Sequence, residues 1–351
     1  MNSCHHKSNL SPHQTLLYCL TTSSCFVASL YIFVPPAVQR LPRDDPLHIR
    51  WRSAVIVAFV FICISIYPWL FCQAAIENDD NHDKEPSFLV YLGIVRQQSL
   101  AECIVQDVKI LLHACVLYLG SFSCTWIEIY QYACQLQSDE LTNNTRISTN
   151  SNVHFSPTPL LLHMIKSIQQ TVLQPKLSSL HQCSTNQTIR WIHLRNLLIA
   201  PIVEEIVFRS LLLPPLLSHY TTTQSAWIAP LFFGVAHFHH HYTKRHLYAD
   251  SKHLMASLVL QWGYTTLFGA YASHVFVRTG SLWGVCAVHS FCNWMGLPEV
   301  GFVRRGSMLF GYRWLIGILY GVGISMFVRL FDSEMNWFPE VSVIGSLVRG
   351  A

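Results

Sequence analysis

Three charged residues interrupt an apolar stretch in the C-terminal half of the sequence. They are Glu204, Glu205 and Arg209. One charge at the centre of a membrane helix costs about 2.5–3.5 kcal/mol, so charges retained there indicate a functional or paired site by default. On a helix, Glu205 and Arg209 lie one turn apart and can form an ion pair. Glu204 points roughly 100° away from Glu205 and needs another partner.

Two later apolar segments carry candidate partners for Glu204. His237 ends the first segment and is followed by histidines at 239–241. His289 and Asn293 lie four residues apart in the second, so they share a helical face, and both can donate hydrogen bonds. Two such donors can stabilise a developing oxyanion. Together with a carboxylate and a histidine that can share its proton, they are the parts needed for general-base attack of water on a carbonyl.

Each of these groups also has another explanation. The charged segment is compatible with an ion-paired helix that has no catalytic role, and polar residues in membrane helices commonly form interhelical hydrogen bonds. The histidine run favours a soluble rim at the membrane surface or a zinc cluster, although no H-E-x-x-H motif occurs. Cys286 and Cys292 flank His289, which leaves a thiol nucleophile open, although neither cysteine has an evident source of thiolate stabilisation.

The composition indicates which class of protein positions these residues. Hydrophobic residues make up 51% of the 351 positions and charged residues 12%, whereas soluble domains carry about 25% charged residues. Most of the chain is therefore expected to face lipid or other helices. The net charge of +4, without a basic stripe, argues against a nucleic-acid partner. The 12 cysteines include no C-x-x-C pair, so no zinc ribbon is expected.

Hydrophobic segments predict an all-α integral membrane protein with about eight transmembrane helices, since a span needs about 20 mostly apolar residues. The last of the eight and the first three are plain apolar spans, and the fourth to seventh carry the polar residues described above. The eight segments are residues 16–34, 54–71, 108–126, 197–217, 226–238, 254–277, 282–297 and 312–331.

We expect a single membrane domain over residues 1–351, with N-terminal spans (1–128), a polar and partly disordered loop (129–190), catalytic helices (191–331) and a tail (332–351). Within the loop, residues 138–158 are rich in Ser, Thr and Asn, and residues 160–173 have the spacing of a surface helix. The basic loops predict a luminal N-terminus and a cytosolic third loop. The sequons at Asn143 and Asn186 should then carry no glycan.

Three motifs occur in an order that resembles a known family. They are E-E-x-x-x-R at residues 204–209, F-x-x-x-H at 233–237 and H-x-x-x-N at 289–293. With the segments LRNLLIAPIVEEIVFRSLLLP, LFFGVAHFHH and HSFCNWMGLP, they resemble the type II CAAX prenyl endopeptidases, the Ras-converting enzymes of the endoplasmic reticulum. The likeness is strong over residues 195–298, and weaker likeness begins near residue 89, with YLGIV at residues 91–95.

This resemblance implies a role for each residue. Glu204 matches the general base on water, and His237 matches the histidine that helps activate that water. His289 and Asn293 match the oxyanion hole, and Glu205 with Arg209 matches a supporting pair. The family is a metal-independent glutamate protease without a cofactor in a multi-pass membrane protein of the endoplasmic reticulum. It removes the last three residues of prenylated proteins ending in C-a-a-X, Ras-type small GTPases among them.

Two other functional classes remain as alternatives to an enzyme. A non-catalytic member of the wider superfamily would bind or scaffold in the membrane without cleaving, although the intact set of four candidate catalytic residues argues against it. A proton-coupled transporter would use the buried glutamates and histidines as a proton relay. Release of a tripeptide from a prenylated peptide distinguishes the protease from both.

Overall fold

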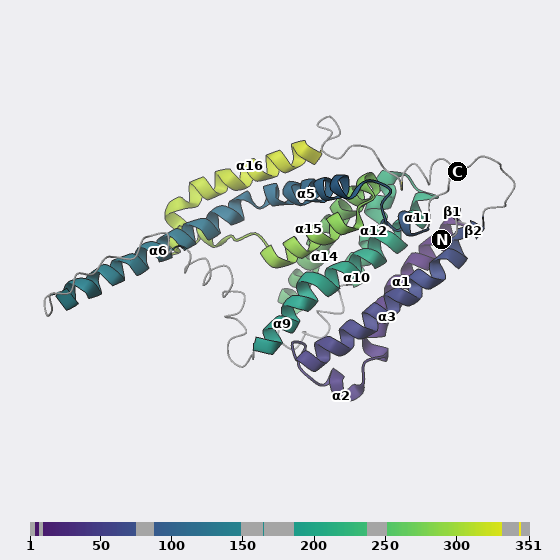
Figure 1. Ribbon diagram of the computed structural model, residues 1–351, viewed down its shortest axis with the longest axis horizontal. Coiled ribbons are helices and arrows are strands. Elements are labelled where there is room, and N and C mark those ends of the chain that lie inside the picture. The colour runs from purple at the N-terminus through teal and green to yellow at the C-terminus, as the bar shows by residue number, and fades with distance from the viewer. Residues whose placement is uncertain are drawn as a thin grey trace. The chain divides into compact units, whose positions relative to one another are not determined.

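The computed structural model describes residues 4–6, 10–74, 88–148, 186–236 and 251–331, together with Met164 and Ile344. The regular structure of these residues is almost entirely helical (Figure 1), which confirms the all-α prediction. The exception is a pair of three-residue antiparallel strands, β1 (Cys4–His6) and β2 (Cys72–Ala74).

The chain divides into two compact units. The helical segment that carries Glu204, Glu205 and Arg209 lies in the first. This unit comprises Met1–Leu112, Arg190–Trp294 and Ser333–Ala351. Most of the residues that the structure describes in this unit are helical. Its elements are α1 (Pro12–Ile32), α2 (Pro36–Gln39), α3 (Pro46–Phe71), α4 (Phe88–Tyr91), most of α5 (Leu100–Leu117) and α9 (Asn186–Leu194), η2 (Arg195–Ile199), α10 (Ala200–Glu205), η3 (Ile206–Leu211), α11 (Leu213–Leu217), α12 (Thr222–Ala236), α14 (Ser251–Thr279) and nearly all of α15 (Leu282–Met295).

The second unit comprises His113–Ile189 and Met295–Asp332. Its two long helices, α6 (Leu119–Ser148) and α16 (Arg313–Phe331), run side by side (Figure 1). Two short 3₁₀ helices, η5 (Gly301–Val303) and η6 (Met308–Tyr312), precede α16. Cys124, Leu309 and Ile316 form its small buried core.

Three helical segments of the described chain are long and apolar enough to cross a membrane: Pro12–Ile32, Pro46–Phe71 and Met308–Phe331. The predicted third span, residues 108–126, is instead bent between α5 and α6, so the total is four if the bent pair is one span. The N–H of Tyr118 donates to the carbonyl of Cys115, three residues back, in a turn tighter than an α-helix. The other predicted spans are helical but shorter or more polar, and the number eight stays a prediction.

The region predicted as a loop begins with a helix. Helix α6 continues to Ser148, so residues 129–148 are helical where the sequence indicated polar, partly disordered chain. The hydroxyl of Thr142 donates to the carbonyl of Ser138, which lets a polar residue fit within the helix. The predicted surface helix at 160–173 lies outside the described residues, apart from Met164.

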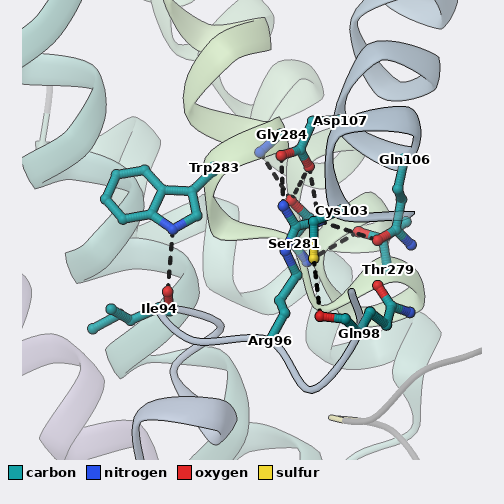
Figure 2. A network of polar contacts seen from close by, with 10 residues as sticks. All are labelled: Ile94, Arg96, Gln98, Cys103, Gln106, Asp107, Thr279, Ser281, Trp283 and Gly284. Atoms are coloured by element: carbon teal, nitrogen blue, oxygen red, sulfur yellow. Dashed lines mark hydrogen bonds and ion pairs between the residues drawn. The ribbon is translucent and has the colours of Figure 1, made fainter. Parts of the chain in front are cut away.

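A tight corner between α14 and α15 sets where the H-x-x-x-N segment begins. Gly280, with φ of +62°, follows the last residue of α14, and its N–H donates to the carbonyl of Phe276. The hydroxyl of Ser281 then accepts from the N–H of Gly284, which caps the start of α15. The same hydroxyl donates to Asp107 at 2.5 Å, so this corner is attached to α5 (Figure 2).

Asp107 also binds Arg96 in the segment that precedes α5. The guanidinium donates through two nitrogens, at 2.9 and 2.6 Å, to the two carboxylate oxygens. Figure 2 also shows the indole of Trp283 donating to the carbonyl of Ile94. The segment before α5 and the first turn of α15 are therefore held together by several polar contacts.

Candidate active site

The helix that carries the two glutamates is not a uniform α-helix. Its central part, α10, is preceded by the π-helical segment η2 and followed by the π-helical segment η3. Such wide turns are rare and occur frequently at functional sites. Pro201 has no N–H to donate to the turn before it, and this lost donor coincides with the end of η2. The segment therefore presents backbone carbonyls to other elements.

Two side chains of α15 bind those carbonyls. The hydroxyl of Ser290 donates to the carbonyl of Leu197 at 2.7 Å. The amide of Asn293 donates from Nδ2 to the carbonyl of Asn196 at 3.0 Å. The irregular helix and the H-x-x-x-N helix are thus fixed to each other about two turns before the glutamates.

Glu205 is the centre of a buried charged cluster. One carboxylate oxygen lies 3.0 Å from Nε of Arg209, and the other accepts from Nη1 at 3.1 Å. The second oxygen also lies 2.6 Å from Nδ1 of His289. The side chains of Glu205 and Arg209 are 0% and 1% exposed. A buried carboxylate requires such partners, because burial of an unpaired charge is strongly unfavourable.

The remaining surroundings of Arg209 are aromatic. Its guanidinium lies 4.8 Å from the ring centre of Phe233 and 5.7 Å from that of Phe268. Phe268 also contacts the ring of His289, with centroids 5.0 Å apart. These rings favour a cation at Arg209 and give the charged cluster apolar surroundings.

Glu204 has a more open environment than its neighbour. Its side chain is 20% exposed and lines a pocket of about 110 Å³. Its Oε2 lies 3.7 Å from Nε2 of His289, which is beyond hydrogen-bond distance. The two ring nitrogens of His289 therefore face different glutamates. Nδ1 contacts the buried Glu205, and Nε2 faces Glu204 in the pocket.

The structure brings together most, but not all, of the residues singled out from the sequence. Glu204, Glu205, Arg209 and His289 form one continuous group, and the ion pair suggested by the four-residue spacing is present. Asn293 lies one turn beyond His289 and uses one amide N–H on a backbone carbonyl. His237 lies outside the described residues.

Among residues that the structure describes, no group of three His, Cys, Asp or Glu side chains is arranged to hold a metal ion. The histidines at 237 and 239–241 are outside this part of the chain. Cys286, one turn before His289, is buried, and its sulfur lies 3.9 Å from the carbonyl of Pro201. Such a contact is typical of a packed thiol.

Sequence reasoning missed three features of the site. The contact between His289 and Glu205 joins segments 84 residues apart, so no local spacing could reveal it. The π-helical segments leave only an indirect signal, which is Pro201 within the helix. Two arginines of the N-terminal region, Arg43 and Arg52, line the same pocket as Glu204. The sequence showed them only as charges in a basic loop.

Comparison with known proteins finds sequence similarity over the part of the chain that forms this site. Residues 186–295 match the family described as "Type II CAAX prenyl endopeptidase Rce1-like". This part of the chain is therefore similar to the Rce1-like family. The match contains both glutamates, Arg209, His289 and Asn293, and it excludes Arg43 and Arg52.

Three curated proteins are similar in sequence to part of the chain. The chain is 40% identical to human CAAX prenyl protease 2 over 154 residues, covering 42% of this chain and 45% of the relative. It is 39% identical over 137 residues to the Arabidopsis thaliana protein of that name, covering 38% and 41%. A "Probable CAAX prenyl protease 2" of Schizosaccharomyces pombe is 40% identical over 124 residues, covering 34% and 44%.

The aligned part of the chain spans less than half the length of each of these relatives. No solved structure gives a significant match to the chain. The likeness to the Rce1-like family is therefore one of sequence, concentrated on the helices that form the site.

Proposed function

We propose that this protein is an intramembrane endopeptidase that removes the C-terminal tripeptide of prenylated C-a-a-X proteins. The observation that carries the proposal is the position of His289 between Glu204 and Glu205, with Glu205 held by Arg209. Glu204 faces a pocket while its neighbour is buried. A reacting water or carbonyl can therefore reach one carboxylate and not the other.

In this mechanism Glu204 is the general base. It takes a proton from a water whose oxygen attacks the carbonyl carbon of the scissile bond, and the carbonyl becomes an oxyanion. When that intermediate collapses, the carbon–nitrogen bond breaks and the protonated base returns the proton to the leaving amine. The family resemblance assigns His237 to hold the same water.

His289 and Asn293 are the proposed donors to the oxyanion. In its doubly protonated form, His289 donates from Nδ1 to Glu205 and still has Nε2–H available on the side that faces Glu204. Asn293 uses one of its two amide hydrogens on the carbonyl of Asn196, which leaves the other to bind the oxyanion. Oxyanion donors of this kind contribute about 10²–10³-fold to the rate.

Glu205 and Arg209 are positioning residues in this proposal. The carboxylate of Glu205 orients the ring of His289, as the aspartate of a catalytic triad orients its histidine. Arg209 balances the charge of Glu205 in a setting that water does not reach. We place the protein in the endoplasmic reticulum membrane, with the C-termini of prenylated proteins as its partners.

The test is incubation of membranes containing the full-length protein with a farnesylated C-a-a-X peptide, followed by mass-spectrometric detection of the tripeptide. Glu204→Gln should lower turnover by about 10²–10⁴-fold, the range typical of a general base. A suitable control is Glu102→Gln. This exposed glutamate binds Ser99 at the start of α5 and should keep wild-type turnover.

Other outcomes would identify the competing classes. Unchanged turnover in Glu204→Gln would refute the general-base role, and turnover abolished by Cys286→Ala would support a thiol nucleophile. Activity lost on chelation and recovered with zinc would indicate a metal protease. If the wild-type protein releases no tripeptide, a membrane scaffold and a proton-coupled transporter are the remaining functional classes.

A further inference from the structure

The pocket beside Glu204 is strongly cationic at one side. Its lining includes Arg43, Arg52 and Arg195. Of the residues that the structure describes in this lining, Glu204 is the one carboxylate. The remaining wall is largely apolar, with Leu30, Ile49, Ile56 and the rings of Phe26 and Phe208 among its members. All of these residues belong to the first unit.

The three arginines come from separate parts of the chain and are held by different contacts. Arg195 donates from Nη1 to Asp44 at 3.0 Å and from Nε to the side chain of Asn196 at 2.8 Å. The guanidinium of Arg52 lies 5.7 Å from the ring of Tyr31. Arg43 is exposed on the loop before α3.

That loop is anchored on both sides of Arg43. Asp45 accepts from the N–H of Leu47 at 2.8 Å and so caps the start of α3. Nδ1 of His48 lies 3.0 Å from the carbonyl of Leu41, and Arg195 donates to the carbonyl of Arg43 itself at 3.3 Å. The guanidinium of Arg43 is therefore attached to a fixed stretch of backbone.

The arginines are close enough to influence one another. Partial removal from water and, after it, the positive charges of Arg195 and Arg52 lower the pKa of Arg43 to about 10. Arg43 is still a cation at neutral pH. Charges of the same sign gathered in one pocket repel each other, so an anion bound among them would be stabilised.

The helix irregularity explains how Arg195 and Glu204 reach the same pocket. Residues nine apart on a regular α-helix point to opposite sides, because each residue turns about 100°. The wide turns of η2 change the angle between the directions in which Arg195 and Glu204 point from the helix axis. Asn196, Ala200, Glu204 and Phe208, spaced four apart through η2, α10 and η3, all line the pocket, with Arg195 at its end.

The spacing fits a short peptide with a free C-terminus. Arg195 lies about 13 Å along the helix axis from Glu204 at 1.5 Å per residue. Three extended residues span about 10 Å. A scissile carbonyl at Glu204 would thus place the end of an aliphatic tripeptide among the arginines, with its side chains against the apolar wall.

We infer that Arg43, Arg52 and Arg195 form a subsite for the free C-terminal carboxylate of the substrate. This inference rests on the proposed function and adds a reason why cleavage occurs three residues from the end of a chain. Two of the three arginines lie before the family-matched segment, so the N-terminal helices complete the site.

The experiment compares two farnesylated peptides that differ only at the C-terminus, one a free acid and the other an amide. The wild-type protein should cleave the acid with a kcat/KM about 10- to 100-fold higher, as expected for hydrogen bonds to a charged group. Arg43→Gln and Arg52→Gln should bring the acid-to-amide ratio towards one by slowing cleavage of the acid alone. Arg50→Gln is the matched control, since Arg50 lies over the ring of Trp191 and does not line the pocket.

Binding of the acid and amide peptides to Glu204→Gln protein tests the subsite without requiring cleavage. It therefore separates this inference from the proposed function. If that protein prefers the acid and Arg43→Gln in the same background removes the preference, the subsite stands even when no cleavage is seen with wild type. Equal kcat/KM for acid and amide, or variants that slow both peptides equally, would overturn the subsite while leaving proteolysis intact. Effects that instead depend on anionic lipid in the vesicles would assign the arginines to a phosphate headgroup and also overturn it.

Discussion

Helix α15 contacts a carboxylate–arginine pair at two places, and the two pairs differ in their access to water. At its start, Ser281 binds Asp107, which holds Arg96, and these two charged side chains are 25% and 11% exposed. Two turns later, His289 binds Glu205, which holds Arg209, with exposures of 0% and 1%. The chemistry of the pairs is nearly the same.

The difference in exposure indicates that the two pairs have different roles, although both contact the same helix. Water can solvate part of the Asp107 pair, so its loss should cost modest stability. The Glu205 pair is buried, and one of its partners is a histidine whose Nε2 faces Glu204. We expect the first pair to fix where α15 begins and the second to affect both stability and catalysis.

The largest effect should follow from Glu205→Gln. It leaves the Arg209 cation buried without its counter-charge, which costs about 3–5 kcal/mol. Thermal unfolding of the protein in detergent or bilayers measures the loss. Adding Arg209→Leu should restore part of the stability but little activity, since His289 has still lost its orienting carboxylate. Unchanged stability in the single variant would contradict the buried ion pair.

Gly93→Ala should disturb the Asp107 end of α15 by distorting the backbone. Gly93 has a φ of +66°, and an added Cβ would lie 2.9 Å from the carbonyl oxygen of Gly280. Left-handed strain together with overpacking predicts a loss of about 2–4 kcal/mol. Gly317→Ala is a control, because an added Cβ there meets no atom within 4 Å. If both variants are equally stable, the close approach at Gly93 does not occur.

Asp107→Asn should have a smaller effect than the Glu205 variant. It weakens the bonds to Arg96 and Ser281, and partial exposure limits the expected loss to about 1–2 kcal/mol. Asp44→Asn, which removes a more exposed pair with Arg195, should change stability by less than about 1 kcal/mol. Chemical denaturation of both variants supplies the comparison, and a larger loss for Asp107→Asn than for Glu205→Gln would reverse the proposed separation of tasks.

Cys286→Ala should have a smaller effect than the changes at Glu205, Gly93 and Asp107. Cys286 lies on α15 between the two pairs and is buried, and its replacement leaves a cavity of about one atom, worth about 1 kcal/mol. Turnover of the farnesylated peptide should stay within a few-fold of wild type. A well-folded Cys286→Ala protein without activity would require a thiol in the mechanism.

Local patterns in the sequence were sufficient for the helical class and for part of the site. Apolar runs predict helices because a chain in lipid must satisfy its backbone hydrogen bonds internally. The four-residue spacing of Glu205 and Arg209 predicted a pair that the structure contains, because both residues lie on one turn of helix. The separate environment of Glu204 follows from the same geometry.

Features that depend on two distant segments required the tertiary structure. The sequence could not place His289 between the glutamates, because that contact joins helices 84 residues apart. Nor could hydropathy locate the bend at Tyr118 within an apolar run, since apolar residues suit straight and bent helices alike. Position 293 was recognised as a donor, but its bond to Asn196 depends on how α15 packs.

The residue types thus determined which reactions are possible, and the packing of helices decided which groups meet. Arg43 and Arg52 are ordinary basic-loop charges in the sequence, and only folding brings them into the pocket with Glu204. The physical reason is that periodicity describes one helix at a time. Which faces of different helices meet depends on side-chain packing and on irregular turns such as those around Pro201.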